Sequence, residues 1–187
     1  MTDASAKSAS RRIVFLIAAL SMAPIVAAFV VYYFFPRPPT ANYGTLLPTA
    51  PAPPLYGARS DGTPFRLDEL RGRWVLVWGE PRDCAAACDK AAYATRQART
   101  MQGKDQDRVV RALLVAGDAP PAAFVAQHPD LVVVRVAADA LASLPGTPGA
   151  LYVIDPLGNL VLRYPEDPDI RGLANDLARL LKASRIG

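Results

Sequence analysis

The stretch that decides the fold is WVLVWGEPRDCAAAC, residues 74–88. Its first five residues are apolar and strand-forming, a continuous run that is typical of a strand buried on both faces of a parallel sheet. Trp74 and Trp78 lie on this strand, and we expect both side chains in the core. Two cysteines follow the strand, and from about Ala85 to Met101 the sequence favours a helix. This order predicts the beginning of an α/β domain.

The chain beyond this stretch continues the same alternation of strands and helices. Apolar runs predict strands at residues 109–115, 131–136, 150–154 and 160–164, and helical patterns lie at residues 120–127, 137–144 and 168–182. The last two strands are joined by the turn Asp155 to Gly158, and so short a connection joins only antiparallel neighbours. We therefore predict a mixed sheet flanked by helices. Sites in such sheets form at the carboxyl ends of the parallel strands, where the two cysteines lie.

An apolar segment precedes the domain. Residues 13–35 contain no charged side chain, and at about 1.5 Å of rise per residue a helix of this length spans about 34 Å, enough for a bilayer core. We predict a transmembrane helix here. The alternative, a cleaved signal peptide, is disfavoured because the run exceeds the usual ~7 to 15 apolar residues and ends without a small-residue cleavage site.

Charge next to this segment predicts its orientation. Lys7, Arg11 and Arg12 precede it, whereas Arg37 alone lies near its exit. The positive-inside rule then leaves residues 1–12 in the cytoplasm, and in a bacterium it places the domain on the periplasmic side of the inner membrane. The formal net charge is +4. Most of that excess lies before residue 56 and no basic run follows, which argues against nucleic acid as a partner.

A proline-rich stretch separates the predicted helix from the predicted domain. Residues 36–55 hold seven of the chain's 18 prolines and show no repeating apolar period. This composition predicts a semi-rigid, partly polyproline spacer. The expected organisation is a membrane segment at residues 13–35, a linker at 36–55 and one domain at 56–187.

Cys84 and Cys88 are the expected seat of the chemistry. On a helical turn, residues four apart share one face about 5 to 6 Å apart at Cβ, so the pair can form a disulfide or hold one soft metal ion. A structural disulfide is a further alternative, although a bridge that closes so short a loop removes little chain entropy. In thiol-disulfide exchange, we expect Cys84 to attack and Cys88 to resolve the mixed disulfide.

Three segments resemble the membrane-tethered thioredoxin-like proteins: residues 61–65, residues 70–78 and residues 146–158. The resemblance covers nearly the whole domain and implies a thioredoxin-like fold. Gly146-Thr-Pro148 is similar to the loop whose proline is cis in that superfamily and packs against the active-site cysteines. The resemblance therefore implies this role, and a cis bond, for Pro148.

The cysteine spacing resembles one branch of that superfamily. Thiol oxidoreductases use Cys-x-x-Cys, whereas the Sco (SenC) copper chaperones of cytochrome c oxidase assembly use Cys-x-x-x-Cys, the spacing of Cys84 and Cys88 here. Sco proteins add a histidine as third copper ligand, and Thr147 stands near where it belongs. His128, the only histidine, is expected to be a surface or helix-end residue at the amino end of the sheet. Without that ligand, two thiolates still suit Cu(I).

These observations leave three hypotheses. The first is a membrane-anchored, Sco-like factor for cytochrome c oxidase assembly, which uses Cys84 and Cys88 as thiol reductant of copper-site cysteines or as a transient Cu(I) carrier. Its expected partner is an oxidase subunit or another thiol or copper protein. The second is a general periplasmic thiol-disulfide oxidoreductase resembling the TlpA-like proteins. The third is a non-catalytic thioredoxin-like binding module, so that enzymatic activity stays open at this point.

Overall fold

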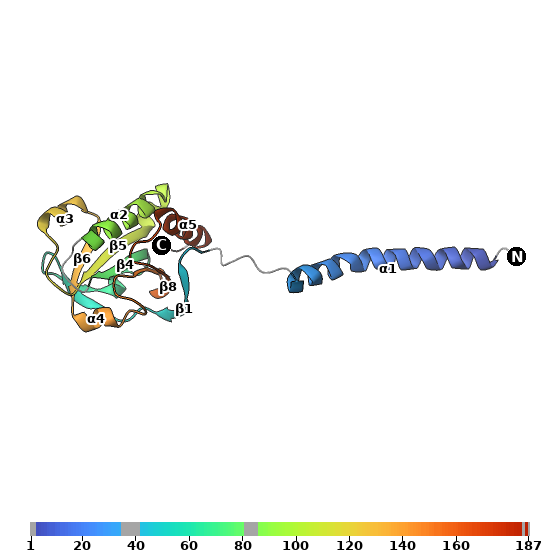
Figure 1. Cartoon of the computed structure of the whole chain (residues 1–187), viewed down its shortest axis with the longest axis horizontal. Helices are drawn as coiled ribbons and strands as arrows, with labels where there is room; N and C mark the ends of the chain where they lie inside the picture. The colour runs from blue at the N-terminus through green and yellow to red at the C-terminus, as the bar shows by residue number, and fades with distance from the viewer. Residues whose placement is uncertain (1–2, 35–41, 81–85, 185, 187) are drawn as a thin grey trace. The chain divides into compact units, whose positions relative to one another are not determined.

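The computed structural model describes residues 3–34, 42–80, 86–184 and 186 (Figure 1). The chain divides into two units, Met1–Ala41 and Asn42–Gly187. The first contains the helix α1, Asp3–Phe34, of which the 23 residues Arg12–Phe34 are long and apolar enough to cross a membrane. The large apolar side chains along this segment are exposed, as contact with lipid requires. Phe35, the predicted end of the span, lies outside the described residues.

The second unit is an α/β domain built on one eight-stranded sheet in the order β1-β8-β7-β4-β5-β6-β2-β3. Its strands are β1 Thr45–Pro51, β2 Tyr56–Arg59, β3 Pro64–Arg66, β4 Trp74–Glu80, β5 Val109–Val115, β6 Leu131–Val136, β7 Leu151–Ile154 and β8 Asn159–Tyr164. Its α-helices are α2 Ala86–Thr100, α3 Ala122–Gln127, α4 Ala138–Ala142 and α5 Ile170–Ala183, and its 3-10 helices are η1 Leu67–Leu70 and η2 Gly103–Arg108.

The predicted mixed sheet is confirmed. β4, β5 and β6 are parallel, whereas β7 pairs antiparallel with both β4 and β8. The hairpin turn between β7 and β8 is closed by the Gly158 N–H, which donates to the Asp155 carbonyl at 2.9 Å. The Asp155 carboxylate also accepts from the N–H of Leu157 and of Asn159. A carboxylate that satisfies the turn's own amides explains why Asp-Pro-Leu-Gly turns the chain here.

Helices cover both faces of the sheet, with α2 and α5 over one face and α4 over the other (Figure 1). Trp74, Leu76 and Trp78 point toward the α2 and α5 face, and Val75 and Val77 point toward the opposite face. This alternation along β4 is the period-two pattern of a strand. Because both of its faces are covered, β4 is apolar from Trp74 to Trp78, and the expectation that both tryptophans lie in the core is confirmed.

One charged side chain lies inside this core. Arg111 on β5 is fully buried, and its guanidinium donates to the Ala92 carbonyl of α2 at 2.9 Å and to Asp130 at 2.6 and 3.2 Å. Burial lowers the pKa of Arg111, against the effect of Asp130. A buried guanidinium is tolerated only where its donors are satisfied, so this network explains how an arginine fits an otherwise apolar strand.

The predicted linker boundary at residue 56 is wrong. β1 pairs with β8, and Leu55 is buried in the core, so the domain includes residues 42–55. The sequence did not predict this strand because it contains prolines, and proline cannot donate a hydrogen bond to a β-ladder. β1 lies at the edge of the sheet, where proline is tolerated, and Pro48 falls at the shift in register between Leu46 and Ala50. β2 was also not predicted.

A buried carboxylate attaches the beginning of the domain to α5. The side chain of Asp176 is almost fully buried and accepts hydrogen bonds from the N–H of Tyr43 at 3.1 Å, from the N–H of Gly44 at 2.8 Å and from the hydroxyl of Tyr164 at 3.1 Å. The hydroxyl of Tyr43 in turn accepts from the N–H of Asp169. The domain is therefore ordered from its first residues, directly after the stretch 35–41 that the structure does not describe.

Candidate functional site

The candidate site lies at the carboxyl end of β4. Glu80 is the last residue of this strand, and its carbonyl accepts from the Ala116 N–H at 3.0 Å. Residues 81–85 follow and lie outside the described residues, so the predicted attacking cysteine, Cys84, is not placed. The strand leads into α2, which begins at Ala86. This strand-to-helix order agrees with the predicted environment of the cysteine pair.

Cys88 lies in the first turn of α2 and is fully buried. Its sulfur is part of a disulfide, and the sequence contains one other cysteine, Cys84. Cys88 belongs to the same apolar cluster as Trp78, Ala91 and Ala92. Burial of one cysteine behind the helix suits a resolving thiol, which reacts only after an intermolecular bond has formed at its neighbour.

Pro148 lies in a loop at the same end of the sheet. This loop lines a pocket of about 170 Å³ together with Gly79 of β4, Leu141 of α4 and Tyr152 of β7. The lining is mostly apolar. A Cβ on Gly79 would lie 2.7 Å from a methyl carbon of Leu141, so glycine at this position allows α4 to approach the end of β4.

The expected cis bond at Pro148 is wrong. Within the described ranges the structure contains no cis peptide bond, and the Thr147–Pro148 bond is trans. The flanking glycines supply the bends of the loop instead, because Gly146 and Gly149 have φ angles of 111° and 81°, which L-residues rarely adopt. The Ala150 N–H closes the turn on the Thr147 carbonyl at 3.2 Å.

The Pro148 loop is held to the sheet by Tyr152. The hydroxyl of Tyr152 donates to the Pro145 carbonyl at 2.8 Å, and burial raises the pKa of this hydroxyl. The phenol therefore stays protonated and keeps its hydrogen bond over the physiological range of pH. The anchoring role of Tyr152 depends on a contact seven residues away that no local sequence pattern indicates.

His128 lies at a helix end, one of the two places predicted for it, and its side chain is buried. It follows the last residue of α3, and its backbone carbonyl accepts from the N–H of Leu131 at the amino end of β6. The ring is buried against Phe124, with 4.8 Å between ring centroids. Burial, followed by the charge of Arg111, lowers the pKa of this imidazole. In the part of the chain that the structure describes, no three His, Cys, Asp or Glu side chains gather as a metal site.

A family model matches more than half of the chain. It is that of the transmembrane-like, thioredoxin-like, C-terminal domain, and it matches residues 74–184. The matched range begins at β4 and ends just after α5, so it contains both cysteines, Pro148 and the other residues that line the pocket of the Pro148 loop. No curated protein sequence matches the chain.

Solved structures share this fold at low sequence identity. ScoI of Arabidopsis thaliana with copper bound is 16% identical, with a TM-score of 0.60 over 72% of this chain and 100% of that one. Yeast Sco1 with copper bound is 15% identical, with a TM-score of 0.61 over 74% of this chain and 96% of that one. The thioredoxin domain of a thiol-disulfide oxidoreductase from Bacteroides vulgatus is 19% identical, with a TM-score of 0.55 over 72% of this chain and 99% of that one. The chain thus has a Sco-like thioredoxin fold.

Proposed function

We propose that this chain, which belongs to the transmembrane-like, thioredoxin-like, C-terminal domain family, is a membrane-anchored, Sco-like thiol-disulfide reductant. It acts through Cys84 and Cys88. The observation that carries the proposal is the disulfide of Cys88 in the first turn of α2, directly beyond the carboxyl end of β4. A bond between such close neighbours in sequence contributes little to stability. Its presence in that position favours a redox role over a structural one.

The proposed reaction exchanges one disulfide for another. In the reduced protein, the Cys84 thiolate attacks one sulfur of a target disulfide and forms a mixed disulfide, and the other target sulfur leaves as a thiolate. The Cys88 thiolate then attacks Cys84, which closes the internal disulfide and releases the second target thiolate. Two electrons pass to the target, which takes up two protons from solvent. The protein is left oxidised, in the state in which Cys88 is bonded here.

The proposed targets are the copper-site cysteines of a cytochrome c oxidase subunit, which must be reduced before they bind copper. The five-residue cysteine motif and the copper-bound Sco neighbours support this choice. The general TlpA-like oxidoreductase is the second candidate, favoured by the neighbouring thiol-disulfide oxidoreductase domain. Pro148 is proposed to contact the target beside the cysteines, because its loop lines the pocket at that end of the sheet.

Copper is proposed as a transient cargo of the same two sulfurs. Cu(I) accepts soft sulfur ligands at low coordination number, so two thiolates suit it without a histidine. The disulfide form offers no thiolate, and reduction must therefore precede binding. We propose that the protein lacks the third, histidine ligand, because Thr147 occupies that position of the resembling motif.

The proposed location is the inner membrane of a bacterium, with α1 as a single-pass anchor and the domain on the periplasmic side. Lys7, Arg11 and Arg12 before the apolar segment support this orientation. Protease added to intact spheroplasts should digest the domain, and digestion only after lysis would reverse the proposed orientation.

Two measurements on the full chain in detergent test the chemistry. The reduction potential of the cysteine pair is measured in redox buffers, together with the rate of reduction of a peptide that carries a copper-site cysteine pair as a disulfide. We expect a potential above the range of structural disulfides, which lie below about −300 mV, but lower than that of the peptide disulfide, and reduction of the peptide that Cys84→Ser abolishes. A potential in the structural range with no exchange would support the non-catalytic module instead.

Anaerobic titration of the reduced chain with Cu(I) against a competing chelator tests the cargo separately. Binding of one Cu(I), lost in Cys84→Ser and in Cys88→Ser, would support transient carriage. Binding no stronger than that of the chelator would remove copper from the proposal and leave thiol-disulfide exchange in place.

A further inference from the structure

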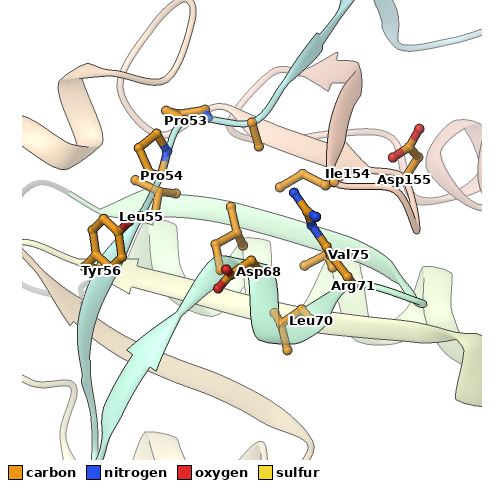
Figure 2. Close-up of a pocket in the computed structure, with 13 residues that line it drawn as sticks. Pro53, Pro54, Leu55, Tyr56, Asp68, Leu70, Arg71, Val75, Ile154 and Asp155 are labelled. Atoms are coloured by element: carbon orange, nitrogen blue, oxygen red, sulfur yellow. The ribbon is translucent and has the colours of Figure 1, made fainter.

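A second pocket, of about 160 Å³, lies at the opposite end of β4 from the cysteines. Three segments form it: the connection between β1 and β2, the 3-10 helix η1 and the turn between β7 and β8 (Figure 2). Val75, at the amino end of β4, lines this pocket, whereas Gly79 near the other end lines the pocket of the Pro148 loop. A ligand in the Val75 pocket would therefore not contact the thiol site.

Apolar side chains form about half of the wall of the Val75 pocket. Its lining includes the side chains of Pro53, Pro54, Leu55, Leu70 and Ile154. The pocket is similar in size to an apolar cavity of about 150 Å³ that binds benzene in another protein. A compact apolar group the size of one ring therefore fits this space.

A cation whose hydrogen-bond donors are unused lies at the pocket. Figure 2 shows the guanidinium of Arg71 extending from the end of η1 toward Ile154. Among the residues that the structure describes, none forms a hydrogen bond or an ion pair with the Arg71 side chain. The positive charge is therefore available to a ligand.

The acidic residues of the pocket are already engaged elsewhere. Asp68 accepts two hydrogen bonds from the guanidinium of Arg66, at 3.0 and 2.6 Å. Asp155 accepts from Leu157 and from Asn159 within its own turn. Neither carboxylate accepts a hydrogen bond from Arg71, although the charge of Arg71 contributes to lowering the pKa of Asp68, so the donors of the guanidinium remain available to a ligand.

The turn between β7 and β8 lies next to the side chain of Arg71. Gly158 in this turn has a φ angle of 93°, and a Cβ built on it would lie 3.2 Å from Nε of Arg71. The side chain of Arg71 thus packs over a residue that has no side chain of its own. Next to it, the N–H of Gly72 donates to the Pro156 carbonyl at 2.9 Å and fixes the backbone.

We propose that the Val75 pocket binds a small organic carboxylate whose apolar part is about the size of one benzene ring. The apolar part lies against Pro54, Leu55 and Ile154, and the carboxylate pairs with the guanidinium of Arg71. A planar guanidinium matches a carboxylate through two parallel hydrogen bonds, whereas a neutral or cationic ligand of the same shape gains nothing from it. The binding is independent of the redox state of Cys88.

The test is calorimetric titration of the full chain in detergent with benzoate and with 3-methylbutanoate, and with benzamide as the neutral analogue of benzoate. We expect saturable binding of at least one carboxylate and binding of benzamide weaker by at least about tenfold, the scale of one charge-assisted pair. Saturable binding of neither carboxylate overturns the proposal, and so does equal binding of benzoate and benzamide.

Two variants locate the binding. Arg71→Gln should weaken carboxylate binding by at least about tenfold, whereas Arg73→Gln, which removes an exposed neighbouring cation outside the pocket, should leave it unchanged. Arg71→Lys keeps the positive charge but lacks the planar guanidinium with its two parallel donors, so this variant should bind the carboxylate with intermediate affinity. Loss of affinity in both glutamine variants would indicate a general charge effect, and loss in neither would remove Arg71 from the site. Either result contradicts the proposal.

Discussion

The guanidinium of Arg111 donates to the carboxylate of Asp130 at 2.6 Å, and this contact joins β5 to the residue that precedes β6. The Arg111 side chain is fully buried, whereas the Asp130 side chain is 34% exposed. The loss of one partner therefore does not have the same cost as the loss of the other. Removing the carboxylate leaves a buried charge with too few acceptors.

Asp130→Ala should destabilise the domain by about 1 to 3 kcal/mol, the cost of an unsatisfied buried polar group. The estimate is below that for a fully buried ion pair because Asp130 is partly exposed. Chemical denaturation of wild type and variant at pH 7 measures this difference in unfolding free energy. Asp107→Ala is the matched control, since it removes an exposed partner of Arg99 and should change stability by less than about 1 kcal/mol. Equal effects would contradict a special role of the buried guanidinium.

The same pair should make stability depend on pH. Burial alone would raise the pKa of Asp130, but the hydrogen bond and charge of Arg111 outweigh burial and hold this pKa below its ordinary value of 3.8. A carboxyl group whose pKa is lower in the folded state contributes stability above its unfolded pKa, and this contribution is lost as pH falls through the folded pKa. The difference in unfolding free energy between wild type and Asp130→Asn should therefore be constant from pH 7 to about pH 5 and shrink below pH 3.8. A difference that grows on acidification would contradict the assigned direction.

Asp176 offers a test of the boundary of the domain. Its carboxylate is the acceptor for the N–H groups of Tyr43 and Gly44, so Asp176→Ala should release the segment that leads into β1. We expect faster amide exchange in residues 43–51 and a loss of about 1.5 to 3 kcal/mol, typical of hydrogen bonds to a charged group. Hydrogen exchange followed by mass spectrometry measures the first effect.

The control for that experiment is Tyr164→Phe. This variant removes one of the three hydrogen bonds to Asp176 and leaves both backbone bonds intact, so β1 should stay protected. If Asp176→Ala left the exchange of residues 43–51 unchanged, pairing with β8 alone would hold β1 in the sheet.

The boundary of the domain shows where sequence reasoning fails. The central strands were predictable because β4, β5 and β6 are covered on both faces and are apolar almost throughout. β1 was missed because its prolines and exposed side chains resemble a linker. An edge strand depends on its one neighbour, β8, and on Asp176 more than a hundred residues away, and neither contact leaves a local pattern.

The candidate site was predictable to a similar extent. The spacing of the cysteines and their position after a buried strand indicated the carboxyl end of β4, where the structure has Cys88. The conformation at Pro148 was not predictable from a motif, because Gly146 and Gly149 give the loop its bends with a trans bond. The burial of His128 was not predictable either, since it depends on packing against Phe124 and not on the polarity of its neighbours in sequence.

Trp78 should report the redox state of the cysteine pair. It shares an apolar cluster with Cys88 and lies near the carboxyl end of β4, whereas Trp74 lies four residues earlier, about 13 Å along the strand. A disulfide quenches the fluorescence of an indole close to it, and Trp78 is the tryptophan nearer to the end of β4 that leads to the cysteines. Reduction of the full chain should therefore increase its intrinsic fluorescence, and the midpoint of this change in a redox titration should equal the reduction potential measured by thiol labelling.

Single substitutions assign that signal. The sequence contains two tryptophans, so Trp74→Phe should keep most of the change on reduction and Trp78→Phe should lose it. Both variants replace one buried aromatic side chain with a smaller one in the same cluster, which makes each a control for the packing defect of the other. A change that survives in Trp78→Phe and disappears in Trp74→Phe would mean that the disulfide acts through the amino end of β4, away from the proposed site. The reductant function would then need a different account of how Cys88 couples to the core.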